Sequence, residues 1–229
     1  MQLEKRLYSV RQGEHFILDG VEFVKLDETL LGAFVVTADV LPDVCPFESY
    51  DYDCEDANNF YSSYIAQEIL RWLRDQHKPI FEATLEQPID LTTMDGMTDY
   101  GTPLVVARLL TIDEYRKYRR FIPLASRPFW LATGWTTKSS PFAGAHTVYY
   151  VGTGGTVDGY GAYGTSFAPR PALHLKSSIL TESGGCRNQG SPQYMCKCKP
   201  DTCNAVVTLA RGDCIRSMDN ESLGSSSVS

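Results

Sequence analysis

The chain has 229 residues, enough for one good-sized domain or two small ones. Hydrophobic residues make up 43% of the sequence and charged residues 21%, an ordinary balance that excludes wholesale disorder. The formal net charge of -7 argues against nucleic acid as the main partner. The longest apolar run, residues 30–41, is broken by Gly32, Thr37 and Asp39 and is shorter than the ~18 residues of a membrane span.

The first part of the chain has β-strand patterns. His15–Leu18 and Val21–Leu26 flank Asp19-Gly20, a pair that supplies the positive φ of a tight turn, so we expect a hairpin. Leu30–Val40 is a further apolar stretch. The acidic, aromatic segment that follows, residues 43–59, predicts a long loop.

Two segments have helical patterns. From residue 61 to 73 the apolar side chains recur at helical spacing, with Ser62 or Ser63 as the N-cap and Pro79 as the stop. The second, Thr111–Ile122, begins with a capping box in which Thr111 and Glu114 satisfy backbone N–H groups reciprocally. Between the two helices, Pro103–Leu110 predicts a buried strand.

The composition changes at Pro128. Residues 128–169 contain eight glycines and nine aromatic residues but only two charged side chains, Lys138 and Asp158. Short strand patterns such as Thr147–Gly152 alternate with turn-prone glycines, and an alternating strand pattern follows at residues 169–175. We therefore expect an α+β domain over residues 1–178, with two helices, short antiparallel strands and long loops, and a cysteine-rich, partly flexible tail over residues 179–229.

Several motifs resemble DUF6273, an uncharacterised domain family of gut Firmicutes and their phages. The motifs are Pro128-Phe129-Trp130-Leu131-Ala132-Thr133, Val148-Tyr149-Tyr150-Val151-Gly152, Arg170-Pro171-Ala172-Leu173, Gly20-Val21-Glu22-Phe23, Ile69-Leu70-Arg71-Trp72-Leu73 and Leu109-Leu110-Thr111-Ile112-Asp113-Glu114-Tyr115. Their order and spacing carry the resemblance over residues 13–180. The chain departs from the family at Ala132, where an arginine is usual.

The family is similar to the C-type lectin-like fold of formylglycine-generating enzymes and phage tropism proteins. The resemblance implies a ligand-binding face built from the glycine- and aromatic-rich loops. It also implies a phage or prophage virion protein, associated with the virion or a cell surface. Because residues 1–16 lack an apolar signal core, we expect synthesis in the cytoplasm without a signal peptide.

Aromatic residues on turn-rich scaffolding predict a binding surface. Tyr and Trp give large amphipathic contact area at low entropic cost, and glycine lets the loops adapt. In the alternative interpretation several of these aromatic rings fill the hydrophobic core instead of binding a ligand, and we expect this of Trp130 and Phe167. The candidate ligand-binding residues are Trp135, Thr136, Lys138, His146, Tyr149, Asp158, Tyr160 and Tyr163.

Two further groups of residues raise the question of metal binding. Asp51, Asp53 and Glu55 could hold Ca²⁺, but Asp56 and Ser62 break the EF-hand pattern, so a solvated acidic loop is favoured. Five of the seven cysteines lie between residues 186 and 214. Their C-x-C spacing fits zinc poorly, so cross-linked or partly reduced cysteines are favoured over a zinc site. We expect no cofactor, with calcium left open.

The sequence lacks the common catalytic signatures G-x-S-x-G, H-E-x-x-H and the P-loop. Its four histidines are scattered, and His174, on the alternating strand, is interpreted as a packed side chain. We therefore expect a non-enzymatic module that recognises a host cell-surface glycan or protein. The alternative is a structural virion protein whose aromatic face binds another subunit or a second copy of the chain.

Overall fold

The computed structural model describes residues 4–30, 32–49, 55–142 and 144–183. The chain divides into residues 1–185 and 186–229, and all described residues belong to the first of these units. The described part is a mixed α+β structure made mostly of strands, with three α-helices. The α+β prediction is therefore confirmed. The predictions for the cysteines between residues 186 and 214 lie outside the described residues.

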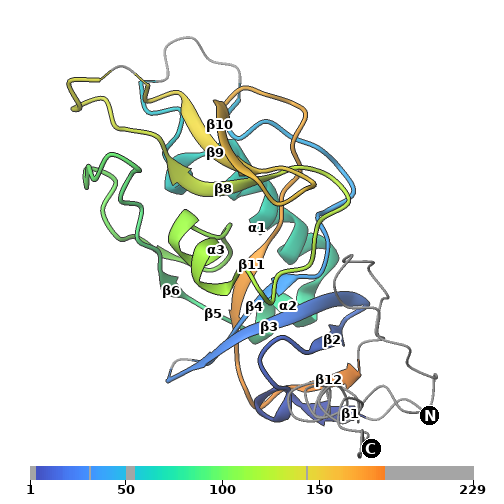
Figure 1. Cartoon of the computed structure of the whole chain (residues 1–229). Helices are drawn as coiled ribbons and strands as arrows, with labels where there is room; N and C mark the ends of the chain where they lie inside the picture. The colour runs from blue at the N-terminus through green and yellow to red at the C-terminus, as the bar shows by residue number, and fades with distance from the viewer. Residues whose placement is uncertain (1–3, 31, 50–54, 143, 184–229) are drawn as a thin grey trace, which may run out of the picture. The chain divides into compact units, whose positions relative to one another are not determined.

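The strands form a long antiparallel sheet, a small antiparallel sheet and a two-stranded ribbon (Figure 1). The long sheet has the order β1 (Glu4–Arg6), β12 (Leu180–Ser183), β2 (His15–Leu18), β3 (Val21–Thr29), β4 (Gly32–Thr37), β11 (Ala172–Leu175), β5 (Thr84–Leu85). The small sheet has the order β10 (Val157–Gly161), β9 (Thr147–Val151), β8 (Phe129–Gly134). The ribbon pairs β6 (Gln87–Pro88) with β7 (Leu104–Val105).

The predicted hairpin is present at β2–β3. Asp19 has φ +50° and Gly20 has φ +75°, so both central residues adopt the left-handed conformation of a tight two-residue turn. The closing strand continues to Thr29, past the predicted end at Leu26. At the other end of the domain, β12 pairs with both β1 and β2, so the long sheet includes residues beyond the expected boundary at 178.

The helices are α1 (Tyr64–Gln76), α2 (Lys78–Ala83) and α3 (Ile112–Tyr118). Ser63 caps α1, and the capping box of Thr111 and Glu114 is present at the start of α3. The prediction of two helices is wrong because Pro79 does not simply end α1. It lies in the first turn of α2, where a proline has no backbone N–H to leave unpaired.

The predicted buried strand at Pro103–Leu110 is wrong in extent. Only Leu104–Val105 is a strand, and Leu104 is exposed. The buried residues that follow form no ladder with any strand that the structure describes, although Arg108 forms a single bridge with Ala172 of β11. A run of apolar residues does not distinguish a strand from a buried irregular segment.

Two apolar clusters cover the two faces of β4 and β8, each of which is buried at every residue. The α1-side cluster includes Ile65, Ile69 and Leu73 of α1, and the α3-side cluster includes Ile112, Tyr115 and Tyr118 of α3. Consecutive residues of β8 alternate between the clusters, with Trp130 in the first and Phe129 in the second. The expectation that Trp130 and Phe167 fill the core is confirmed, because both are buried.

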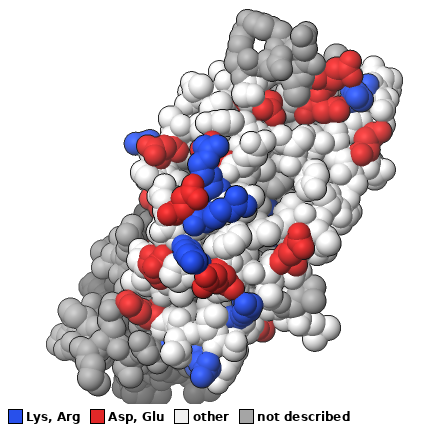
Figure 2. Space-filling model, turned by 180° about the vertical axis from the view of Figure 1, so that it is seen from behind, with Lys and Arg blue, Asp and Glu red and all other residues white. Residues whose placement is uncertain are grey.

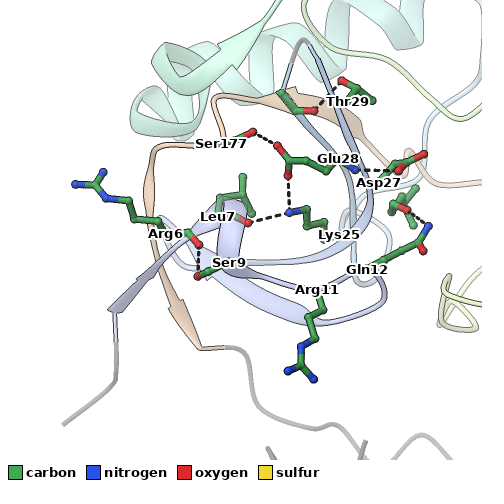
Figure 3. Close-up of polar contacts among 12 residues, drawn as sticks. Arg6, Leu7, Ser9, Arg11, Gln12, Lys25, Asp27, Glu28, Thr29 and Ser177 are labelled. Atoms are coloured by element: carbon green, nitrogen blue, oxygen red, sulfur yellow. Dashed lines mark hydrogen bonds and ion pairs between the residues drawn. The ribbon is translucent and has the colours of Figure 1, made fainter. Parts of the chain in front are cut away.

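The buried side chain of Lys25 on β3 connects the short helical turn at Leu7–Ser9 to the long sheet. Lys25 is 3% exposed, and its ammonium group donates to the Leu7 carbonyl at 3.0 Å and pairs with Glu28, which also accepts from Ser177 (Figure 3). The lysine aliphatic stem thus lies in the interior while its charge is satisfied by a carboxylate and a carbonyl. This contact fixes η1 (Leu7–Ser9) against the end of β11.

His174 lies on β11 and stacks on Phe34 of β4, with ring centroids 4.6 Å apart. Burial lowers the pKa of His174 to about 4, and the nearby charge of Arg108 acts in the same direction. The packed role predicted for this histidine agrees with this geometry.

We expect folding stability to fall as the pH is lowered from about 6.5 to about 4. The unfolded chain binds a proton at His174 in this window and the folded chain does not, so acid favours unfolding. A His174→Leu variant should show a smaller loss of melting temperature over that pH range, measured by circular dichroism. His146→Leu, at an exposed histidine, is the control and should keep the full loss. Equal acid sensitivity of the wild type and His174→Leu would contradict the assignment.

Candidate ligand-binding surface

The small sheet carries the glycine- and aromatic-rich segment, and one buried amide fixes the loop that leaves β8. Asn58 is fully buried, and its Nδ2 donates to the carbonyls of Thr136 at 2.8 Å and Thr147 at 3.0 Å. Its Oδ1 accepts from the Tyr100 hydroxyl at 2.6 Å. A Cβ at Gly134 would lie 2.7 Å from Asn58 Nδ2, so glycine is required for this close approach.

A carboxylate fixes the same loop from outside. Asp95 accepts hydrogen bonds from the hydroxyls of Thr93 at 2.6 Å, Ser140 at 2.9 Å and Thr136. Although its slight burial acts in the opposite direction, these bonds hold the pKa of Asp95 at about 2. The loop after β8 is therefore positioned by polar bonds to residues 93–95 and to Asn58, more than 30 residues away in sequence.

Trp135 is a half-exposed aromatic platform on the α3 side of the small sheet. Its ring is 44% exposed and stacks on Tyr149, with centroids 5.6 Å apart and an interplanar angle of 12°. The ring also lies over Gly159 of β10, where a Cβ would be 3.4 Å from it. Tyr149 itself is buried; burial raises the pKa of its phenol, and the charge of Arg116 opposes that shift. Tyr149 thus supports Trp135 from below and is a poor candidate for direct ligand contact.

Tyr160 lies on the opposite face of the small sheet. Gly159 is opposite Tyr149 in the register of β10 and β9, and Tyr160 is opposite Val148, which belongs to the α1-side cluster. Because neighbouring strand residues point to opposite faces, Tyr160 points away from Trp135. Its ring is 51% exposed and packs against Tyr150, Phe167 and Gly164. The structure therefore does not bring Trp135 and Tyr160 onto one surface.

The remaining predicted residues have different environments. Thr136 is fully buried and donates to Asp95, so its hydroxyl positions the loop. Lys138 is exposed and pairs with Glu55 at 3.1 Å and Asp56 at 3.4 Å; the pKa of its ammonium group is raised chiefly by the hydrogen bond to Glu55. The exposed His146 lies 6.2 Å from the Tyr163 ring, measured between centroids.

The last predicted residue, Asp158, is exposed on β10, and its carboxylate accepts the N–H of Gly159 at 2.7 Å. Its position on the strand places it on the same face as Tyr160. Of the eight candidates, only Trp135 is a broad exposed ring on the α3 side.

The calcium candidates are only partly described. Asp51 and Asp53 lie outside the described residues, and Glu55 pairs with Lys138. Among the residues that the structure describes, no group of three or more His, Cys, Asp or Glu side chains has the geometry of a metal site. The described cysteine, Cys45, is half-buried with its pKa raised to about 12 by burial, so its thiol is protonated at neutral pH.

Sequence reasoning missed Asn58 and Asp95, which fix the loop that carries Trp135. Asn58 follows an acidic stretch whose composition predicts a solvated loop, and nothing in the local sequence pattern indicates that its side chain is buried. Asp95 lies in a threonine- and glycine-rich segment whose composition predicts only a turn. Thr136, which bonds both residues, is 78 positions from Asn58 and 41 from Asp95, so no local spacing could have identified the network.

A shallow apolar hollow lies elsewhere on the surface. It has a volume of 240 Å³ and is lined mainly by apolar residues of η2 (Phe60–Ser62), α1 and the segment from Leu104 to Ala107. Tyr61 and Leu104 are more than half exposed at its rim. None of the predicted site residues lines this hollow.

Charge on the described surface is mixed in sign. Figure 2 shows Lys and Arg interspersed with Asp and Glu on the face that it presents, without a broad patch of one sign. No helix in the described part of the chain combines the length and apolar character needed to cross a membrane. A mixed surface of this kind provides no strong electrostatic steering of a charged partner on that face.

We expect Asn58→Ala to destabilise the fold by about 2–4 kcal/mol, because it leaves the Thr136 carbonyl without the amide donor and removes the buried bonds to the Thr147 carbonyl and the Tyr100 hydroxyl. The Thr147 carbonyl still accepts the N–H of Trp135. Asn59→Ala is the matched control. Asn59 only caps η2 through a bond to the Tyr61 N–H, so its loss should cost about 1 kcal/mol. Urea unfolding of the three proteins measures both values. Equal stability of the two variants would show that the Asn58 network does not hold the loop.

Comparison with known proteins found no matching family model, no matching curated protein and no matching solved structure. The family resemblance therefore stays a prediction from the sequence motifs. In the structure, the half-exposed ring of Trp135 stacks on Tyr149 on one face of the small sheet, and the exposed ring of Tyr160 lies on the other face.

Proposed function

We propose that this chain is a non-enzymatic binding module that recognises a host cell-surface ligand, a glycan or a protein, through the Trp135 platform. The observation that carries the proposal is the flat, half-exposed indole ring stacked on Tyr149 and lying over Gly159. An indole held in this way has its outer surface available, and the apolar face of a sugar ring stacks on such a surface. Burial of the rigid ring costs little conformational entropy.

The surroundings of the ring support the same function. The loop after β8 is fixed by Asn58 and Asp95, so the platform is already positioned before a ligand arrives. The charge of Arg116 of α3 opposes the rise in the pKa of Tyr149, so a cationic side chain, paired with Asp113, is present on the α3 side. Polar groups next to a stacking ring are what orients a polar ligand.

We also propose that the fold is C-type lectin-like. A mixed antiparallel architecture, with a separate small sheet carrying the aromatic segment, is compatible with the C-type lectin-like fold implied by the resemblance. Arg170 of the resembling Arg-Pro-Ala-Leu motif is almost completely buried and donates to three backbone carbonyls, which gives that motif a structural role here. A phage or prophage virion location rests on the resemblance alone.

The alternative function is a structural virion protein whose aromatic residues bind another subunit. Two observations favour it: Tyr160 is exposed on the opposite face from Trp135, and Tyr61 and Leu104 project beside an apolar hollow. Exposed aromatic and apolar groups of this kind are common at protein interfaces. The two functions use different surfaces, Trp135 on one side and Tyr160 or the hollow on the other, and can be separated by mutation.

We expect Trp135→Ala to weaken ligand binding at least tenfold, because it removes the stacking surface, with little change in melting temperature. The wild type is first screened on a glycan array with and without Ca²⁺ and for adsorption to candidate host cells. The variant is then titrated against each ligand retained.

Tyr8→Ala is the matched control, since Tyr8 is an aromatic residue of similar exposure on η1, outside the small sheet. It should bind like the wild type. Tyr160→Ala tests the opposite face and should also retain ligand binding if Trp135 alone forms the platform. Unchanged binding by Trp135→Ala would refute the proposed site.

A further inference from the structure

β10 is an edge strand of the small sheet and is exposed along most of its length. Within the described part of the chain it pairs with β9 alone, and Val157, Asp158, Tyr160 and Gly161 are exposed. This contrasts with β8, which is buried at every residue. An exposed edge of this kind is a template for pairing with another strand.

The hydrogen-bond pattern shows which backbone groups face outward. The Gly152 N–H donates to Thr156 and the Ala162 N–H donates to His146, so both residue pairs are hydrogen-bonded pairs of the antiparallel ladder. Such pairs alternate with non-hydrogen-bonded ones. In the register of β10, the N–H and C=O groups of Asp158 and Tyr160 therefore face β9, and those of Val157, Gly159 and Gly161 face the open edge.

We propose that this edge is an interface between two copies of the chain, in which the β10 strands pair antiparallel about a two-fold axis at Gly159. In that register Gly159 meets Gly159 of the second copy, and Val157 meets Gly161 of the second copy. These are the three residues whose backbone groups face outward, so the N–H groups of each strand lie opposite C=O groups of the other. Two of these groups also make local bonds: the Gly161 carbonyl accepts the Gly164 N–H at 2.9 Å, and the Gly159 N–H donates to Asp158 at 2.7 Å. In the paired strands the Gly161 carbonyl accepts a second donor, the Val157 N–H of the second copy. Glycines at 159 and 161 add no side chain at the contact.

The side chains of β10 are also self-complementary in this register. Asp158 is opposite Tyr160 of the second copy, and both lie on the same face of the sheet. The phenol can donate to the carboxylate, which now accepts the N–H of Gly159 at 2.7 Å. The same pairing occurs twice across the axis. Pairing therefore exchanges a local bond of Asp158 for one that connects the two copies.

The two-fold symmetry would also strengthen ligand binding, an inference that rests on the proposed function of Trp135. Directly opposed residues of two antiparallel strands point to the same face, so the axis places both Trp135 rings on one face of the joined sheet. Two platforms on one face would bind a repetitive cell surface with higher avidity than one platform. The interface itself depends only on β10.

The test is the mass of the chain in solution as a function of concentration. Light scattering after size exclusion, in a reducing buffer that prevents cysteine cross-links, should show a rise from 25.5 kDa towards twice that value. A contact limited to one strand predicts a dissociation constant in the micromolar to millimolar range, so sedimentation equilibrium should extend to about 1 mM chain. A single species of monomer mass at every concentration would overturn the proposal.

Gly161→Pro and Gly161→Ala form the decisive pair. The proline removes an outward N–H without removing a bond to β9, and should weaken dimerisation at least tenfold. The alanine keeps the N–H, and its Cβ meets no heavy atom within 4 Å, so it should dimerise like the wild type. Val157→Pro repeats the test at the other end of the strand. Circular dichroism of each variant confirms that it is folded.

Tyr160→Phe tests the side-chain part of the interface and should weaken the dimer by removing the donor to Asp158. Equal dimerisation of the proline and alanine variants would show that the dimer uses another surface. Ligand binding by Gly161→Pro separates the two proposals. If this variant is monomeric and still binds at Trp135 with single-site affinity, the proposed function stands whether or not the interface does.

Discussion

The burial of β4 and β8 on both faces is the constraint on which the described structure depends. A strand that is apolar on both sides must have a layer on each side, and α1 and α3 provide the two layers. Since consecutive strand residues point to opposite faces, Trp130 and Phe129 enter different clusters.

Among the described residues, three cationic side chains are buried in this interior, and each is held by a different set of partners. Arg170 donates to the carbonyls of Thr37, Ala38 and Pro123, and burial lowers its pKa to about 10. Arg108 makes a bidentate pair with Glu114 at 2.6 and 2.7 Å. Lys25 bonds Leu7 and Glu28. Arg170 and Lys25 join segments distant in sequence, whereas Arg108 and Glu114 lie six positions apart and connect the segment before α3 to its first turn. These polar contacts make the packing more specific than the apolar clusters alone would.

The aromatic residues of the small sheet divide into two groups by the alternation of strand residues. Trp135 and Tyr149 lie on the α3 side, and Tyr160 and Tyr150 lie on the other. The aromatic residues therefore do not form one continuous surface. Trp135 forms a platform on one face of the small sheet, and Tyr160 is an exposed ring on the other face, at the edge strand. Ligand recognition and self-association can then occupy separate parts of one small sheet.

The sequence alone determined the local features: the Asp19-Gly20 hairpin, a serine cap at Ser62 or Ser63, the capping box at Thr111 and a strand beginning at Thr147. Each depends on the conformational preferences of neighbouring residues or on hydrogen bonds between residues a few positions apart. Only the tertiary structure decided that Thr136 and Tyr149 are buried, that Asn58 holds the loop, and that Trp135 and Tyr160 face opposite ways. Burial and register depend on which distant segments meet, and no local pattern encodes that meeting.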